Sequence, residues 1–127
     1  MLNRRYFKHF FNRLTYRTAG ISAEDVEHYA SMYQQPGGLR CGLDTYQAFH
    51  ADAAENKAWL EKHGKSTVPV CALNGEKSFL CEIATDQVSE VYESVTDVRR
   101  VPESGHYISE ENPRGYVKEI LDFVAKH

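Results

Sequence analysis

Apolar positions in the first half of the chain recur with the period of a helix. Between residues 3 and 17, aromatic and aliphatic side chains are spaced three or four positions apart with basic residues between them. This spacing predicts a helix with an aromatic face. A second apolar stripe predicts a helix from about 23 to 35, and no segment of this half has the pattern of a strand.

The break at Pro36-Gly37-Gly38 separates these helices from a longer periodic segment. Apolar residues repeat at spacings of three, four and seven from Leu39 to Leu60, and Gly64 follows them. The spacing predicts one long helix, or two helices with a joint near Asp52, that ends at the glycine.

The second half of the chain has a different pattern. Residues 68 to 73 form a continuous apolar run of strand length, which predicts a strand buried on both faces. Helical spacing follows between 83 and 92, and then a second short strand at 98 to 101. Asn112-Pro113 predicts the start of a last helix, with a buried stripe at Val117, Ile120, Leu121 and Val124.

The order of these segments predicts an α/β fold. Residues 1–63 would form a helical, cap-like region, and residues 64–127 a βαβα unit whose two strands run parallel. Two parallel strands leave two unpaired edges, and a uniformly apolar strand is expected to have neighbours on both sides. We therefore expect another subunit or a missing segment to complete the sheet.

Composition narrows the classes of function. The chain has 127 residues, 42% of them hydrophobic and 26% charged, which is typical of one soluble domain. A formal net charge of -3 argues against a nucleic-acid partner, because binding phosphates requires clustered Lys and Arg. No apolar run approaches the roughly 20 residues of a membrane span, and the charged N-terminal segment argues against a signal peptide.

Cysteine and histidine spacing adds two expectations. Cys41, Cys71 and Cys81 form no Cys-x-x-Cys pair and lie among apolar residues, so we expect reduced core thiols and a cytoplasmic protein. The six histidines lack the spacing of metal ligands. We therefore expect no metal and no cofactor.

The segment 102–113, Pro-Glu-Ser-Gly-His-Tyr-Ile-Ser-Glu-Glu-Asn-Pro, places a histidine on a glycine turn directly after a predicted strand. Together with the segments 33–49 and 68–75, in this order, it resembles the cap and C-terminal portion of an α/β-hydrolase of the epoxide hydrolase and haloalkane or haloacid dehalogenase kind. The resemblance implies that His106 activates the water that hydrolyses an alkyl-enzyme ester. It also implies that Tyr46 donates a hydrogen bond to the opening epoxide oxygen, and that Glu76 could orient the histidine.

The chain also departs from this family. The nucleophile elbow, Gly-x-Asp-x-Gly or Gly-x-Ser-x-Gly, is found nowhere in the sequence. We therefore expect a truncated or partial hydrolase that is not competent alone and needs a missing N-terminal half to act on a small apolar substrate. Glu110 and Glu111 favour the start of the last helix and need no catalytic explanation.

Two alternatives remain open. The chain could be a freestanding oligomeric protein, descended from a hydrolase, that binds small molecules or other proteins. A dimer would then cover residues 68–73 and the aromatic face of the first helix. An enzyme with a new nucleophile at Cys41 or Ser78 is the less favoured alternative, because neither residue lies on a recognisable elbow.

Overall fold

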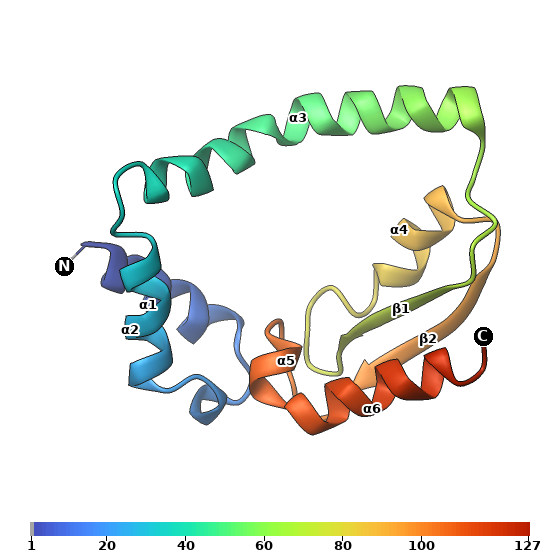
Figure 1. Cartoon of the computed structure of the whole chain (residues 1–127). Coiled ribbons are helices and arrows are strands. Elements are labelled where there is room, and N and C mark those ends of the chain that lie inside the picture. The colour runs from blue at the N-terminus through green and yellow to red at the C-terminus, as the bar shows by residue number, and fades with distance from the viewer. Residues whose placement is uncertain (1) are drawn as a thin grey trace. The chain divides into compact units, whose positions relative to one another are not determined.

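The computed structural model describes the backbone of residues 2–127 and their side chains except at positions 2, 3 and 96. The chain divides into two compact units, one made of the residues up to His9 with Ala23–Gly64 and the other of Phe10–Ser22 with Lys65–His127. The elements in chain order (Figure 1) are α1 Leu2–Leu14, the 3-10 helix η1 Thr18–Gly20, α2 Ala23–Met32, α3 Gly38–His63, β1 Val70–Gly75, α4 Ala84–Val91, β2 Val95–Val101, α5 Ile108–Glu111 and α6 Pro113–Val124.

The first unit is helical. Helix α3 is continuous over 26 residues, so the alternative of two helices with a joint near Asp52 is wrong. Gly64 ends it with φ of 77° in the left-handed region, and its N–H donates to the Leu60 carbonyl oxygen at 2.8 Å. Glycine adopts this conformation without the steric cost that a side chain would bring.

Aromatic side chains pack this unit. The ring centroids of Phe7 in α1 and Tyr33 lie 4.8 Å apart. A Cβ atom at Gly42 of α3 would lie 2.8 Å from the Tyr33 ring, so the glycine permits this approach. No described residue of α3 is buried, and Tyr46, Phe49 and Trp59 are all more than half exposed.

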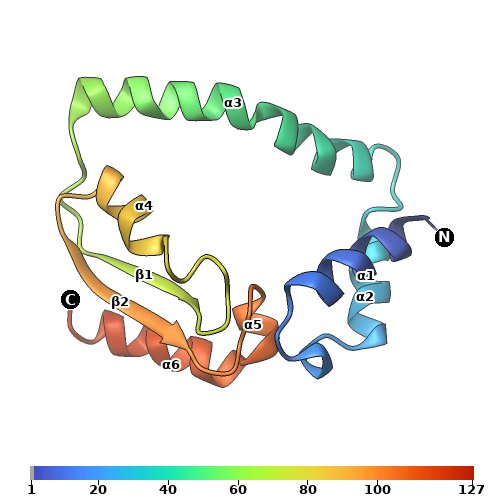
Figure 2. The same ribbon diagram turned by 180° about the vertical axis from the view of Figure 1, so that it is seen from behind.

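The second unit contains the sheet. Strands β1 and β2 pair in parallel with Gly75 opposite Val101, and Figures 1 and 2 show α4 and α6 on opposite faces of the pair. Val101 is fully buried, and Ala72 is the most deeply buried apolar residue of β1. This small core lies between the strands and the two helices that cover them.

The start of α6 confirms its predicted cap. Asn112 Oδ1 accepts a hydrogen bond from the Gly115 N–H at 2.9 Å, and Pro113 occupies the first turn. The predicted buried stripe of this helix is wrong, because Val117, Ile120, Leu121 and Val124 are all exposed. Helical spacing identifies an apolar face, but burial depends on whether another element covers it.

An arginine on the sheet binds α6. The Arg99 side chain is largely buried, and its Nε lies 2.7 Å from Asp97 Oδ2 while its Nη1 lies 3.2 Å from Glu119 Oε2. The Arg99 guanidinium lowers the pKa of Asp97, mainly through this hydrogen bond. The ion pair with Glu119 therefore connects β2 to α6, while the pair with Asp97 lies within β2.

The predicted α/β class is wrong. Helices account for 60% of the chain, and the described residues contain a sheet of only two strands, so the protein is mostly helical and does not have the α/β-hydrolase type of fold that was expected. The predicted strand at 68–73 is shifted to Val70–Gly75, and Val68 is exposed instead of buried. The prediction of the fold class failed because it rested on the order of helices and strands along the chain and did not consider how few residues the strands contain.

The cysteines differ in environment. All three are free thiols, but Cys41 is exposed, Cys71 is partly buried and Cys81 is buried, so the expectation of a core position is wrong for Cys41. Burial raises the pKa of the Cys71 thiol. Among the helices of residues 2–127, none has the length and apolar character that crossing a membrane requires.

Candidate functional site

The candidate site lies where the carboxyl ends of the two strands meet. Beyond the Gly75–Val101 pair, the Glu76 N–H donates to the Val101 carbonyl oxygen at 2.9 Å. The Lys77 N–H then donates to the Ser104 carbonyl oxygen, also at 2.9 Å. These bonds join the loop after β1 to the turn after β2, which carries the histidine. The carboxyl edge of a parallel sheet is a common place for a functional site.

The turn after β2 is tightly constrained. Ser104 is fully buried, and its hydroxyl donates to the Val101 carbonyl oxygen at 2.8 Å. Glu103, which precedes it, has φ of 50°, a left-handed conformation that is unusual for a residue with a side chain. Its N–H donates to Glu76 Oε2 at 3.2 Å. Local backbone strain of this kind persists where surrounding contacts fix it.

Two glycines allow the turn to pack closely. A Cβ atom at Gly105 would lie 2.6 Å from the Leu14 carbonyl oxygen and 2.8 Å from the Tyr16 nitrogen. A Cβ atom at Gly75 would lie only 1.9 Å from the Gly105 carbonyl oxygen. The glycine before His106 is therefore required by the close approach of backbone from the segment that follows α1.

A buried carboxylate connects these segments. Glu111, at the end of α5, is 2% exposed. Its Oε2 accepts hydrogen bonds from the backbone N–H groups of Tyr16 at 2.7 Å, Arg17 at 2.8 Å and Gly105 at 3.0 Å. Its Oε1 accepts one from the Tyr107 N–H at 3.1 Å. The four donors offset the cost of burying the carboxylate.

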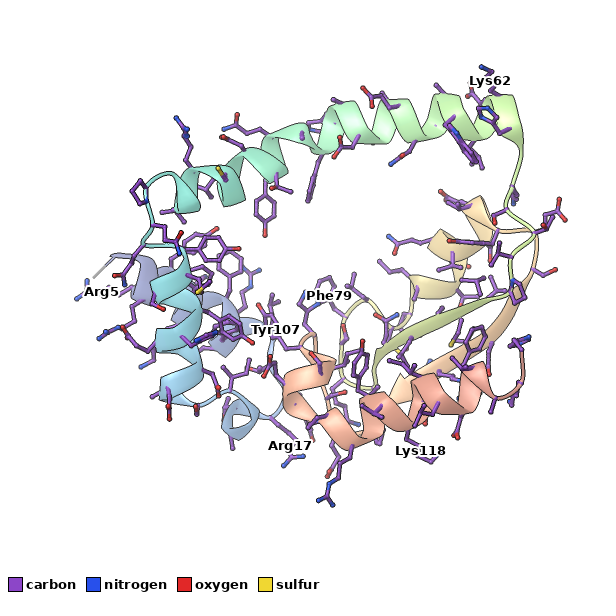
Figure 3. All side chains as sticks on the ribbon, viewed as in Figure 1. Arg5, Arg17, Lys62, Phe79, Tyr107 and Lys118 are labelled. Carbon is purple, nitrogen blue, oxygen red and sulfur yellow. The ribbon has the colours of Figure 1, made fainter. Side chains whose placement is uncertain are left out.

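His106 presents its ring to solvent while its backbone is fixed. Its N–H donates to the Leu14 carbonyl oxygen at 3.0 Å. The ring stacks on Phe79 with centroids 6.2 Å apart and planes 19° apart, and it meets the edge of Tyr107 at 5.1 Å. Phe79 and Tyr107 are labelled in Figure 3. His106 is exposed, so its ring lies at the surface beside these two aromatic rings.

Glu76 lies beside this turn but binds other groups. Its Oε1 lies 3.0 Å from Lys77 Nζ, and its Oε2 accepts from Glu103. The hydrogen bond from Lys77, followed by that from the Glu103 N–H, lowers the pKa of the Glu76 carboxyl. Its carboxylate contacts the histidine turn only through backbone, and its role as the acid that orients His106 stays a prediction.

Tyr46 belongs to the first unit, whereas His106 belongs to the second, so their pairing also stays a prediction. The Tyr46 ring is 59% exposed and lies 5.2 Å from the Phe49 ring. It lines a small cavity of about 70 Å³ with Tyr6, Phe7, Tyr33, Leu39, Gly42 and Leu43. A phenol at the edge of an apolar hollow has the chemistry to donate a hydrogen bond to a substrate oxygen.

Sequence patterns missed Glu111 and Phe79. The sequence predicts for Glu111 only that it favours the start of the last helix, yet its carboxylate is buried and accepts hydrogen bonds from residues 94 and 95 positions away in sequence. The spacing of apolar residues within a helix or strand gives no information on contacts between residues so far apart in sequence. The one available signal was the pair of acids directly before Asn112-Pro113, of which the second faces inward. In the described part of the chain, His, Cys, Asp and Glu side chains form no group that could hold a metal ion.

Comparisons with known proteins find a similarity to solved structures. No protein-family model matches the chain, and neither does any curated protein. Among solved structures, the chain is similar to wild-type Cfl2 from Burkholderia cenocepacia, with a TM-score of 0.86 and 32% sequence identity. The similarity covers 94% of this chain and 40% of the Cfl2 chain, so nearly all of the fold described above has a counterpart in less than half of a longer polypeptide.

Proposed function

We propose that this chain carries the water-activating histidine of a hydrolase related to epoxide hydrolases and dehalogenases, and that further polypeptide supplies the nucleophile. The observation that supports this most is the His106 turn, which fixes the backbone of the residue and leaves its side chain exposed. An imidazole held in this way at the carboxyl edge of two strands suits a general base.

The similarity to Cfl2 supports the need for further polypeptide. This chain spans 40% of that protein, and its own sequence contains no nucleophile elbow. Sixteen large apolar side chains of the described residues are exposed, including Val117 and Leu121 on α6. Where such side chains lie together on one element, as on α6, their exposure is typical of a surface that another chain or segment covers.

The proposed chemistry has two steps. A carboxylate of the further polypeptide would attack an epoxide carbon or a carbon that bears a halogen, so that a C–O ester bond forms and the C–O or C–halogen bond breaks. With an epoxide, the Tyr46 hydroxyl would protonate the oxygen that leaves. His106 would then take a proton from water, whose oxygen attacks the ester carbonyl and releases the alcohol and the free carboxylate. The imidazolium then gives up this proton through solvent, to the Tyr46 phenolate after an epoxide or to the medium with the released halide.

Trapping the ester tests this function. A reading frame with a nucleophile elbow is first sought beside the one for this chain; the two chains are then expressed jointly and incubated with a small terminal epoxide. We expect turnover with His106, and a nucleophile-bearing peptide heavier by the mass of the substrate in His106→Gln, because the second step is then blocked. The proposal is wrong if no such reading frame exists, or if His106→Gln retains turnover.

The exposed face of α6 favours a second candidate, an oligomeric binding protein in a reducing cytoplasm. Pro113, Arg114, Val117, Lys118, Leu121 and Asp122 line an open surface hollow of about 540 Å³ on this helix. A second copy of the chain would cover it together with other exposed apolar residues. Native mass spectrometry of the purified chain distinguishes the candidates, since a dimer supports this one and a monomer at micromolar concentration contradicts it.

A further inference from the structure

We infer that Glu111 is the positioning residue for His106, because its buried carboxylate binds the backbone on both sides of the histidine and ties it to the segment that follows α1. This inference rests on the proposed role of His106 as the base. It assigns to Glu111 a task that differs from the usual orienting acid of a catalytic histidine, since the carboxylate contacts backbone and leaves the ring alone.

The contacts bracket the histidine in sequence. Gly105 donates to Oε2 at 3.0 Å and Tyr107 to Oε1 at 3.1 Å, so each neighbour of His106 is bound to a different oxygen of the same carboxylate. The N–H of His106 itself donates to the Leu14 carbonyl oxygen at 3.0 Å. Three consecutive N–H groups are therefore fixed, and the side chain of the middle residue is directed by them.

The carboxylate also has a fixed place of its own. Oε2 accepts from Tyr16 at 2.7 Å and Arg17 at 2.8 Å, distances typical of charge-assisted bonds. A Cβ atom at Gly20 would lie 2.8 Å from the Glu111 Cα, so the backbone of α5 packs directly on η1 at this point. Neither end of the Glu111 side chain can therefore shift without moving a backbone segment.

The requirement is for an ionised acid in particular. All four partners are N–H donors, and a carboxylate only accepts. A glutamine in its place would direct its own NH₂ group either at the Tyr107 N–H or at the three donors on the other oxygen. Glu111→Gln therefore removes at least one of the bonds that bracket His106 while keeping the shape and size of the side chain.

Nuclear magnetic resonance of the full chain tests the inference without any assay of hydrolysis. We compare Glu111→Gln with Glu90→Gln, a matched control whose side chain is exposed on α4. In Glu111→Gln, amide exchange at Gly105 and Tyr107 should accelerate at least about tenfold more than exchange in β1 and β2. The His106 ring protons, which lie against the Phe79 ring, should move toward the shifts of an unstructured histidine. Glu90→Gln should change neither.

Two results would overturn the inference. Unchanged His106 ring signals in Glu111→Gln would show that the carboxylate does not set the place of the ring. If amide exchange accelerates by the same factor in β1, β2 and the turn, Glu111 stabilises the whole unit and does not position His106 specifically. The wild-type chain offers a measurement that needs no variant, namely scalar couplings through the hydrogen bonds from the Tyr16, Arg17 and Gly105 amides to the Glu111 carboxyl carbon, and their absence would also overturn it.

These outcomes are separable from those of the proposed function. If His106→Gln retains turnover but the amide and ring signals respond to Glu111→Gln as expected, the base assignment fails and the positioning geometry stands. If the ester accumulates but the signals do not respond, His106 is the base and another group positions it.

Discussion

The turn that carries His106 and the long helix α3 differ in how far their side chains are buried and hydrogen-bonded. At the turn, Ser104 and Glu111 are buried and hydrogen-bonded, and glycines at 75 and 105 let backbone segments touch. Helix α3 has no buried residue over its 26 positions. The turn is thus fixed by contacts within its own unit, whereas the apolar side chains of α3 are only partly covered within theirs. A general base needs a fixed environment like that of the turn. A surface that another chain covers can instead have exposed apolar side chains like those of α3.

Replacing Glu111 by alanine should have the largest effect, because it removes the contacts that distinguish the turn from α3. Four backbone N–H groups lose their acceptor, and leaving such groups unsatisfied in a buried place costs about 1 kcal/mol or more each. We expect the free energy of unfolding of the second unit to fall by about 4 kcal/mol in chemical denaturation, with Glu90→Ala as the control. A loss below about 1 kcal/mol would mean that the turn is not organised by this carboxylate.

Gly75→Ala should be the next most damaging change. Its Cβ would lie 1.9 Å from the Gly105 carbonyl oxygen, so β1 and the histidine turn must separate. Overpacking of this kind costs about 3 kcal/mol. Gly64→Ala is the matched control, because nothing lies within 4 Å of its Cβ and only its positive φ opposes the change, at about 1 kcal/mol or more. Thermal unfolding that ranks these two variants in the opposite order would contradict the close packing.

The ion pairs of β2 should make stability depend on acid pH. The Arg99 guanidinium lowers the pKa of Asp97 in the folded state. The unfolded carboxyl therefore takes up its proton first, so the stabilisation is complete above about pH 5 and is lost as the pH falls through the lower, folded pKa. Arg99→Met should flatten the decrease in unfolding free energy between about pH 5 and pH 2. Arg100→Met, at a more exposed arginine, should leave the slope close to that of the wild type.

Phe49→Ser on α3 should have the smallest effect. The Phe49 side chain is 54% exposed, and a substitution at such a surface position changes stability by less than about 0.5 kcal/mol. Ala72→Ser in the buried part of β1 is the comparison and should cost more. A large loss from Phe49→Ser, and one that grows with protein concentration, would show instead that α3 is covered by a second chain.

The sequence predicted local features better than long-range ones. The cap at Asn112 and the end of α3 at Gly64 follow from residues a few positions apart, and both were found where they were expected. The exposure of the apolar stripe of α6 was not foreseen, because amphipathic spacing identifies an apolar face but does not show whether another element covers it. Glu111 could not be found because its partners at Tyr16 and Arg17 adjoin it only after folding. The fold class failed because the two strands found near the predicted positions form too small a sheet to make an α/β protein.

Amide hydrogen exchange of the wild-type chain tests most directly whether the histidine turn is fixed by its own unit while α3 is not. The amides of Gly105 and Tyr107 lie outside any long helix but donate to a buried carboxylate, whereas α3 amides have regular helical bonds and no buried side chains. We predict that the two turn amides exchange at least about 100-fold more slowly than those in the middle of α3, which corresponds to about 2.7 kcal/mol in opening free energy. Equal rates, or slower exchange in α3, would contradict the account.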